Sequence, residues 1–209
     1  MSVPSLPIQQ ALQLLDNIRP LTRPMEAYLT AYLEVRNYHP YEFILRNGET
    51  CDHLSFIAEG LIRIYSESPS RHEPVSKEIC NWFLMEGDLA ISVESFFMRI
   101  PSDEYIQTLE PTTIVSISYD NLQDIYSAFP EFNYHGRILT QSYYIKAVRQ
   151  LKALRYKRAA DSYYYLERYC PNLLQRVPAQ HLAGYLGVDE TYIKALHARR
   201  KAFSQEGLA

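Results

Sequence analysis

Cysteine is scarce in this sequence, and long apolar runs are missing from it. Cys51, Cys80 and Cys170 are odd in number and far apart among 209 residues, which favours free thiols in a reducing compartment over a disulfide scaffold. No stretch approaches the roughly 20 apolar residues that cross a bilayer. The first residues have neither the basic nor the apolar region of a signal peptide. We therefore expect a cytoplasmic protein without membrane contact.

Motifs of common catalytic and cofactor chemistry are missing too. The sequence has no Gly-rich phosphate loop, no HExxH pair and no Gly-x-Ser-x-Gly elbow. Scattered cysteines argue against a metal cluster, because such sites usually take four ligands in close pairs. We expect no enzyme, no metal and no cofactor. One alternative stays open, a haem ligand among His39, Cys51, His53, His72 and Cys80.

The charges are unevenly distributed along the chain. From Lys146 onward there are 12 Lys or Arg against 5 Asp or Glu, whereas the preceding residues hold 9 basic and 19 acidic side chains. A basic segment behind an acidic one indicates nucleic-acid contact at the basic end, and the alternative is a solvated basic face. The content of 47% hydrophobic and 22% charged residues is typical of a globular protein with one large or two modest domains.

The first two thirds of the sequence predict helices followed by a β domain. Apolar spacing predicts helices over 8–18 and from about 25 to 35. Short β-branched and aromatic runs then alternate with turn sequences such as Asn47-Gly48 and Glu59-Gly60, which is typical of a sandwich, roll or barrel. The expected strands are 43–45, 54–58, 61–65, 78–83, 105–109 and 113–117.

A long helix is expected after the β domain. Asp120 is placed to cap a first helix, and a second helical segment without proline runs over about 131–154. Ile138, Ile145 and Val148 lie along it, and more than five turns are too long for a small domain to cover. We expect this helix to pair with its counterpart in a homodimer. The alternative is packing against its own sheet.

Residues 179–198 have the layout of a helix-turn-helix. Ala183 is small enough for two helices to cross closely, and Gly187, four residues later, supplies the positive φ of a tight turn. Asp189 is placed to cap the second helix, and Gln180 is placed to contact a phosphate. Five apolar positions flank the turn: Leu182, Leu186, Val188, Ile193 and Leu196. The alternative is an ordinary helical hairpin.

Much of the chain resembles the Crp/Fnr family of bacterial transcription regulators. The similar segments are 43–49, 56–65, 86–89, 117–120, 173–178 and 182–188. The resemblance implies an α+β fold with an N-terminal β-roll, similar to a cyclic-nucleotide-binding jelly roll, with flanking helices. A long dimerisation helix and a C-terminal helix-turn-helix follow. We expect the roll over 1–130, the dimer helix over 131–155 and the DNA-binding domain over 156–209, with a short or absent wing.

Members of this family place the second helix of the motif, here about 190–200, in the major groove. The DNA-binding residues expected on this resemblance are Gln180, Thr191, Tyr192, Lys194, His197, Arg199 and Arg200. Two positions depart from the family, because Thr191 stands where members commonly have Glu and Ala195 where they have Arg. We therefore expect an operator that differs from the family's usual one, or a weakened direct readout.

The resemblance also implies an effector pocket, at Gly87, Asp88, Leu89, Arg99, Ser102 and Asp103. Members that bind cyclic AMP hold its phosphate with an Arg-Ser pair. Ser102-Asp103 stands at that position, where a carboxylate repels a phosphate. Arg99 is a nearby substitute. We expect a roll that does not bind cyclic AMP, with Gly87 and Asp88 serving a turn.

The partners implied by the resemblance are double-stranded DNA, a second copy of the chain, an unidentified small-molecule effector and RNA polymerase. The expected function is a homodimeric transcription regulator. The alternative is a ligand- or protein-interaction module that keeps the fold with a degenerate helix-turn-helix. Thr191 and Ala195 favour that alternative, and the basic C-terminal third disfavours it.

Overall fold

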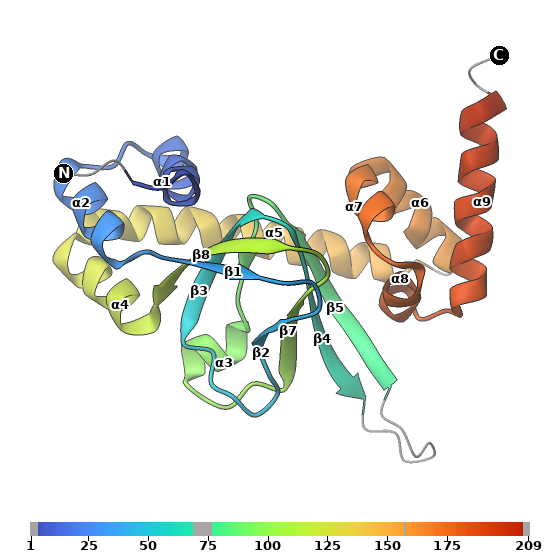
Figure 1. The fold of residues 1–209 in the computed structure, drawn as a ribbon, viewed down its shortest axis with the longest axis horizontal. Helices are drawn as coiled ribbons and strands as arrows, with labels where there is room; N and C mark the ends of the chain where they lie inside the picture. The colour runs from blue at the N-terminus through green and yellow to red at the C-terminus, as the bar shows by residue number, and fades with distance from the viewer. Residues whose placement is uncertain (1–3, 69–76, 157, 207–209) are drawn as a thin grey trace. The chain divides into compact units, whose positions relative to one another are not determined.

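The computed structural model describes residues 4–68, 77–156 and 158–206, coloured along the chain in Figure 1. The chain divides into two compact units. The first, which we call the roll unit, contains Met1–Ile64 and Phe83–Ile145. The second, which we call the helical unit, contains Tyr65–Trp82 and Lys146–Ala209. The chain therefore passes from one unit to the other three times.

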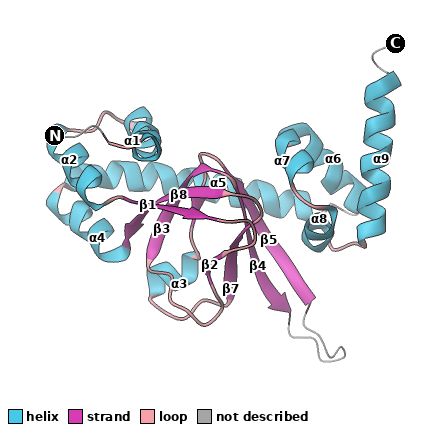
Figure 2. Cartoon of the chain, in the orientation of Figure 1, coloured by secondary structure: helices cyan, strands magenta, loops and turns pink. Residues whose placement is uncertain are grey.

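The elements follow one another as helices, strands and then helices again, and Figure 2 shows this change from strand to helix. The strands are β1 Glu34–Tyr38, β2 Phe43–Leu45, β3 His53–Glu59, β4 Leu61–Ser68, β5 Lys77–Met85, β6 Leu89–Ala90, β7 Glu104–Thr108 and β8 Thr112–Ser118. The helices are α1 Leu6–Ile18, α2 Arg23–Tyr32, α3 Val93–Met98, α4 Tyr119–Ala128, α5 Asn133–Leu154, α6 Ala159–Tyr169, α7 Pro171–Arg176, α8 Ala179–Leu186 and α9 Glu190–Glu206. A 3-10 helix, η1 Pro130–Phe132, precedes α5. In the described part of the chain no strand follows β8, and no helix is long and apolar enough to cross a membrane.

The strands form an antiparallel sandwich of two four-stranded sheets. One sheet has the order β1-β8-β3-β6 and the other β2-β7-β4-β5. Nearly fully buried side chains come from both sheets, with Ile57 and Ile114 in the first and Ile62 and Ile106 in the second. The apolar core of the roll is therefore built from both sheets. Burying one such side chain stabilises the fold by about 1.5–3 kcal/mol.

Helix α1 covers the first sheet. Ala11 of this helix packs in one apolar cluster with Phe56 and Ala58 of β3 and Val115 of β8. Phe56 and Ala58 are two residues apart on β3 and therefore point to the same face of the sheet. Strand β3 is thus buried on both of its faces, which explains why residues 54–58 are apolar at every position but Ser55.

The predicted α+β fold is confirmed, and all six predicted strands are present with small differences at their ends. Two local predictions were wrong. The helix expected to reach residue 35 ends at Tyr32, because Val35 belongs to β1, which pairs with β8. The helix expected to be capped by Asp120 begins at Tyr119, and the Ser118 side chain caps it instead by accepting the Asn121 N–H at 3.2 Å.

The helical unit has its own buried centre. Tyr163 of α6, Leu182 of α8 and Ile193 of α9 are each almost completely buried. Gly187 ends α8 with φ +67° and ψ +35°, a left-handed conformation that glycine adopts without the steric cost of a Cβ. The turn glycine predicted from the sequence is therefore confirmed.

A part of β5 packs with the C-terminal helices inside the helical unit. The side-chain amide of Gln150 on α5 donates a hydrogen bond to the Asn81 carbonyl of β5. A Cβ built on Gly184 of α8 would lie 3.4 Å from the Glu78 carbonyl oxygen. The backbone of β5 thus approaches α8 closely, at a position where the sequence has no side chain.

Candidate functional site

The turn before β6 is held by backbone geometry and one carboxylate. Gly87 has φ +85°, a conformation that favours glycine, and its N–H donates to the Ile57 carbonyl at 2.9 Å. The Asp88 carboxylate accepts the Met85 N–H at 3.0 Å, and the Asp88 carbonyl accepts the Ile57 N–H at 2.9 Å. Gly87 and Asp88 therefore fix this turn against β3.

Ser102 belongs to a small polar group that we call the cassette cluster: Ser92, Ser102 and Glu104. Ser102 is 4% exposed, and its hydroxyl lies 3.0 Å from Ser92 Oγ and accepts the Glu104 N–H at 3.0 Å. The Ser92 hydroxyl donates to the Glu104 carboxylate at 3.1 Å. Each hydroxyl of the cluster thus has a partner within the chain, and the neighbouring Asp103 is exposed.

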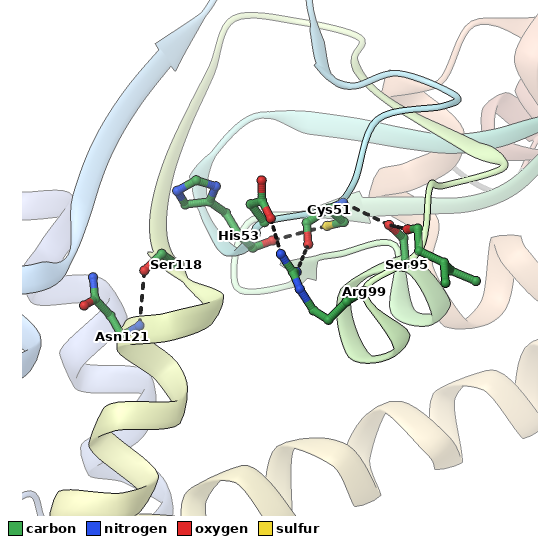
Figure 3. A network of polar contacts seen from close by, with 8 residues as sticks. Cys51, His53, Ser95, Arg99, Ser118 and Asn121 are labelled. Carbon is green, nitrogen blue, oxygen red and sulfur yellow. Dashed lines mark hydrogen bonds and ion pairs between the residues drawn. The ribbon is translucent and has the colours of Figure 1, made fainter.

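Arg99 makes its contacts on the segment before β3. It ends α3 in a left-handed conformation, with φ +55°. Its guanidinium donates to the Cys51 carbonyl at 2.9 Å, pairs with the Asp52 carboxylate and lies 4.4 Å from the centre of the Tyr119 ring. Figure 3 shows the side chain turned toward these oxygens. Arg99 therefore ties α3 to the segment before β3, and does not contact Ser102 or Asp103.

These contacts bear on phosphate recognition. A cyclic phosphate bound at the Ser102-Asp103 position would meet the carboxylates of Asp103 and Glu104 instead of a cation. Carboxylates and a phosphate repel each other, and the repulsion grows as water is excluded.

The roll unit contains an apolar cavity of about 70 Å³. Leu14 and Leu15 of α1, Leu29 of α2, Leu122 of α4 and Leu139 of α5 line it, together with residues of β3 and β8. Leu89 is the one residue of the expected effector pocket that also lines this cavity. The cavity and the cassette cluster are therefore separate features.

The titratable side chains near α3 are structural. The Cys51 N–H donates to Ser95 Oγ at 2.9 Å, and the Cys51 thiol points to the His53 carbonyl at 3.5 Å. Burial raises the pKa of the Cys51 thiol and lowers the pKa of His53. In residues 4–68, 77–156 and 158–206 no three His, Cys, Asp or Glu side chains gather as metal ligands. Among the five residues listed above for haem, Cys80 is buried, His39 is exposed, and His72 lies outside the described residues.

Tyr143 joins α5 to the turn before β6. The Leu89 N–H donates a hydrogen bond to its hydroxyl. Burial raises the pKa of Tyr143 well above its ordinary value, and the nearby Asp88 carboxylate raises it further. The hydroxyl therefore stays protonated at neutral pH. Sequence analysis missed this residue, because its partner lies 54 positions away.

Helix α5 carries large apolar side chains that remain exposed in a single chain. Tyr144 is 70% exposed, Ile145 50% and Leu151 58%, while Ile138 and Val148 are half-buried. The helix has 22 residues, which corresponds to a length of about 33 Å. Exposed apolar side chains along a long helix are typical of a surface that another helix covers.

The helix-turn-helix is formed by α8, Gly187 and α9. The Val188 N–H donates to the Ala183 carbonyl at 3.1 Å across the turn, and the Asp189 carbonyl accepts the Tyr192 N–H at 3.0 Å at the start of α9. Ala183 is buried, as expected for the crossing point of two helices. The short connection with a left-handed glycine is typical of DNA-binding motifs of this kind.

The expected DNA-binding residues fall into two groups. His197 Nδ1 is hydrogen-bonded to the Tyr163 hydroxyl at 3.1 Å, and Arg200 Nε pairs with the Glu167 carboxylate at 3.0 Å. Both side chains therefore attach α9 to α6. The exposed members of the set are Gln180, Thr191, Tyr192, Lys194 and Arg199. Tyr163 and Glu167 were missed by sequence analysis, since nothing in the local sequence links α6 to α9.

Comparison with known proteins supports the fold. Residues 35–129 match the family model of the cyclic nucleotide-binding domain, whereas no curated protein matches the chain in sequence. The c-di-GMP-responsive regulator CLP of Xanthomonas campestris is 16% identical with a TM-score of 0.63, over 88% of this chain and 93% of CLP. FixK2 of Bradyrhizobium japonicum is 13% identical with a TM-score of 0.65, over 82% of this chain and 86% of FixK2.

A third structure, from Eubacterium rectale, is named as a transcriptional regulator of the Crp/Fnr family. It is 16% identical with a TM-score of 0.65, over 92% of this chain and 89% of its own. At such identities the likeness concerns the fold, and in that respect the resemblance seen in the sequence is confirmed. The chain thus shares the fold of Crp/Fnr regulators over most of its length, and its residues 35–129 are similar to the cyclic nucleotide-binding domain.

Proposed function

We propose that this protein is a homodimeric DNA-binding transcription regulator of the Crp/Fnr type, active in the cytoplasm, with RNA polymerase and a small-molecule effector as further partners. The observation that carries the proposal is the pair α8 and α9 joined by the left-handed Gly187. The excess of Lys and Arg from residue 146 onward supports it, since basic side chains supply the sequence-independent part of DNA affinity.

Helix α9 is the recognition helix of this proposal. Its N-terminal residues, with Thr191, Tyr192 and Lys194 exposed, contact base edges in the major groove. Arg199 and Gln180, both exposed, contact phosphates. His197 and Arg200 contribute by holding α9 against α6, through Tyr163 and Glu167. Any contact of His197 or Arg200 with a phosphate is secondary to this role.

The dimer forms along α5. Ile138 and Ile145 are one heptad apart and Val148 follows, so a second copy of the same helix covers the exposed apolar row. Two recognition helices related by a two-fold axis then read two half-sites of a palindrome. Signalling is a population shift, in which an effector binds one arrangement of the dimer more tightly than the other.

The roll of this regulator does not take cyclic AMP. The Ser102-Asp103 position offers a carboxylate, and Arg99 is engaged by Cys51 and Asp52. CLP has the same fold and is described as responsive to c-di-GMP, so the fold is compatible with other effectors.

A second candidate function is a protein- or ligand-interaction module with a degenerate helix-turn-helix. Thr191 and Ala195 favour it, because they replace residues that read bases in the family. The use of His197 and Arg200 within the unit favours it as well. The excess of basic residues argues against it.

Selection of tight binders from random duplex DNA tests the proposal. We expect a palindromic winner that binds far more tightly than bulk DNA and loses affinity with Lys194→Ala, measured over a series of salt concentrations. Arg23→Ala, which removes an exposed positive charge from α2 of the roll unit, is the control. Binding that is weak, steep in salt and indifferent to sequence would contradict the proposal. Absence of binding by a folded dimer would support the interaction module.

The dimer has its own test. Ile145→Asp places a charge in the proposed apolar seam, so we expect a monomer by light scattering. Gln10→Asp adds the same charge at an exposed position of α1, away from α5, and should leave the dimer intact. A dimer in both variants would disprove the assignment of α5.

A further inference from the structure

The exposed face of the N-terminal part of α9 has methyl groups at its centre. Ile193 and Leu196 are buried on one side of the helix. At about 100° per residue, Thr191, Ala195 and Ala198 then lie close together on the opposite side, and all three are exposed. We call these three residues the reading face.

The charged residues lie at the flanks of the reading face. Glu190 and Lys194 form an ion pair at 2.8 Å on one flank, at the i,i+4 spacing. Tyr192, which is 42% exposed, and Arg199 lie on the other flank. The positive end groups of Lys194 and Arg199 therefore lie to the two sides of the reading face, and its centre carries no charge.

Among the α9 side chains that the structure describes, up to residue 200, the remaining cation is Arg200, which is directed toward α6. Arg200 pairs with Glu167 at 3.0 Å, and the neighbouring His197 bonds to Tyr163. The centre of the exposed face thus presents two Ala methyl groups and the methyl and hydroxyl of Thr191. It carries no guanidinium for guanine and no amide for adenine.

Each base presents different chemistry in the major groove. Guanine offers acceptors to Arg or Lys, adenine suits Asn or Gln, cytosine donates to a carboxylate, and thymine alone has a 5-methyl group that packs against apolar side chains. We propose that the reading face recognises thymine methyl groups, with Thr191 and Ala195 packed against thymines of each half-site. Small side chains also let the helix approach the base edges closely. The inference rests on the proposed function, and narrows the operator to thymine-containing half-sites.

Replacement of thymine by uracil in the selected duplex tests this inference, because it removes only the methyl group. We expect each critical replacement to weaken binding by about fourfold, the factor that corresponds to one buried methyl. Replacement in both half-sites should weaken it by about 15-fold. With Thr191→Ser, which removes one methyl and keeps the hydroxyl, the uracil duplex and the thymine duplex should bind equally at that position. Thr140→Ser on α5 makes the same change away from DNA and should preserve the difference.

The outcomes separate the inference from the proposed function. Sequence-specific binding that changes by less than twofold with uracil at every thymine would overturn the inference alone. A selected half-site without thymine would also overturn it. Absence of DNA binding by the folded dimer would overturn the proposed function, and this inference with it.

Discussion

The roll unit and the helical unit differ in where their polar side chains find partners. In the roll unit the cassette cluster is closed by its own hydrogen bonds, and Arg99 is held by Cys51 and Asp52. In the helical unit the polar residues at the start of α9 face solvent, with Thr191, Lys194 and Arg199 exposed. A ligand at the cassette cluster must replace contacts that the chain already makes. A ligand at α9 displaces water and counterions, and competes only with Glu190 for the charge of Lys194.

This difference shows why a fold is a poor guide to a ligand. The chain has the fold of known regulators, yet the polar groups of the cassette cluster are paired with one another. The polar residues at the start of α9 are exposed. The state of individual polar atoms, paired or exposed, therefore says more about where a ligand can bind than the fold does.

The turn glycines of the two units give the largest expected difference in stability. Gly60 has φ +114°, and a Cβ there would lie 2.7 Å from the Thr112 Cα, so Gly60→Ala combines strain with a backbone clash. We expect a loss of about 3–5 kcal/mol in the free energy of unfolding. Gly187 has φ +67° with open space around its Cβ position, so Gly187→Ala should cost about 1–2 kcal/mol. Urea denaturation of both variants measures this, and equal losses would contradict it.

Each unit also contains a half-buried tyrosine whose ionisation links stability to alkaline pH. Burial raises the pKa of Tyr143 in the roll unit and of Tyr185 in the helical unit. Above pH 10 the unfolded chain loses these protons while the folded chain keeps them, so stability falls as pH rises. We expect about 1.4 kcal/mol less stability per tyrosine at pH 11 than at pH 9.

The variants Tyr143→Phe and Tyr185→Phe check this expectation. Each should reduce the difference in denaturation free energy between the two pH values, since phenylalanine has no proton to lose. A pH dependence that is identical in both variants and in the unaltered protein would show that these hydroxyls ionise freely.

The cassette cluster allows a smaller and more local test. Ser102→Ala removes hydrogen bonds to Ser92 and Glu104 in a buried site, so we expect a loss of about 1–2 kcal/mol. Asp103→Ala, at the adjacent exposed position, should change stability by less than about 0.5 kcal/mol. Thermal denaturation compares them. A larger effect at Asp103 would mean that the carboxylate, and not the hydroxyl, holds this segment.

The smallest expected effect is that of cyclic AMP itself. At 1 mM it should leave the melting temperature unchanged, with 5′-AMP as the control. A site with a Kd of about 10 μM would instead gain about 2.7 kcal/mol at this concentration. A rise in melting temperature that is specific to cyclic AMP would contradict this comparison, because the paired polar groups of the roll unit would then be open to a ligand as well.

Strands with apolar alternation and the helix-turn-helix were accessible from the sequence. The six predicted strands carry their own signal, since β-branched runs are bounded by turn residues such as Gly48 and Gly60. Strand β1 was not predicted, because four of its five residues are exposed and its sequence has no apolar alternation. Its backbone pairing with β8 makes it a strand. Helix α3, of six residues, is too short for a periodic signal.

The details of the candidate site were less accessible, because they depend on distant partners. The sequence names Arg99 but not its contact with Asp52, 47 residues earlier. It names Arg200 but not the ion pair with Glu167 on another helix. Whether a charged side chain is free for a ligand is decided by such long-range pairs. The motif identifies the helix, and the packing decides which of its residues remain exposed.

The three passages of the chain between the units have a consequence for the exchange of modules. A fragment cut at Lys146 would carry α6 to α9 without Tyr65–Trp82, the segment that belongs to the same unit. Gly184 and Gln150 would then lose their contacts with the β5 backbone. A single recombination point therefore cannot transfer the helical unit into a relative with all of its contacts. An exchange of this unit between relatives needs three crossover points, one at each passage of the chain.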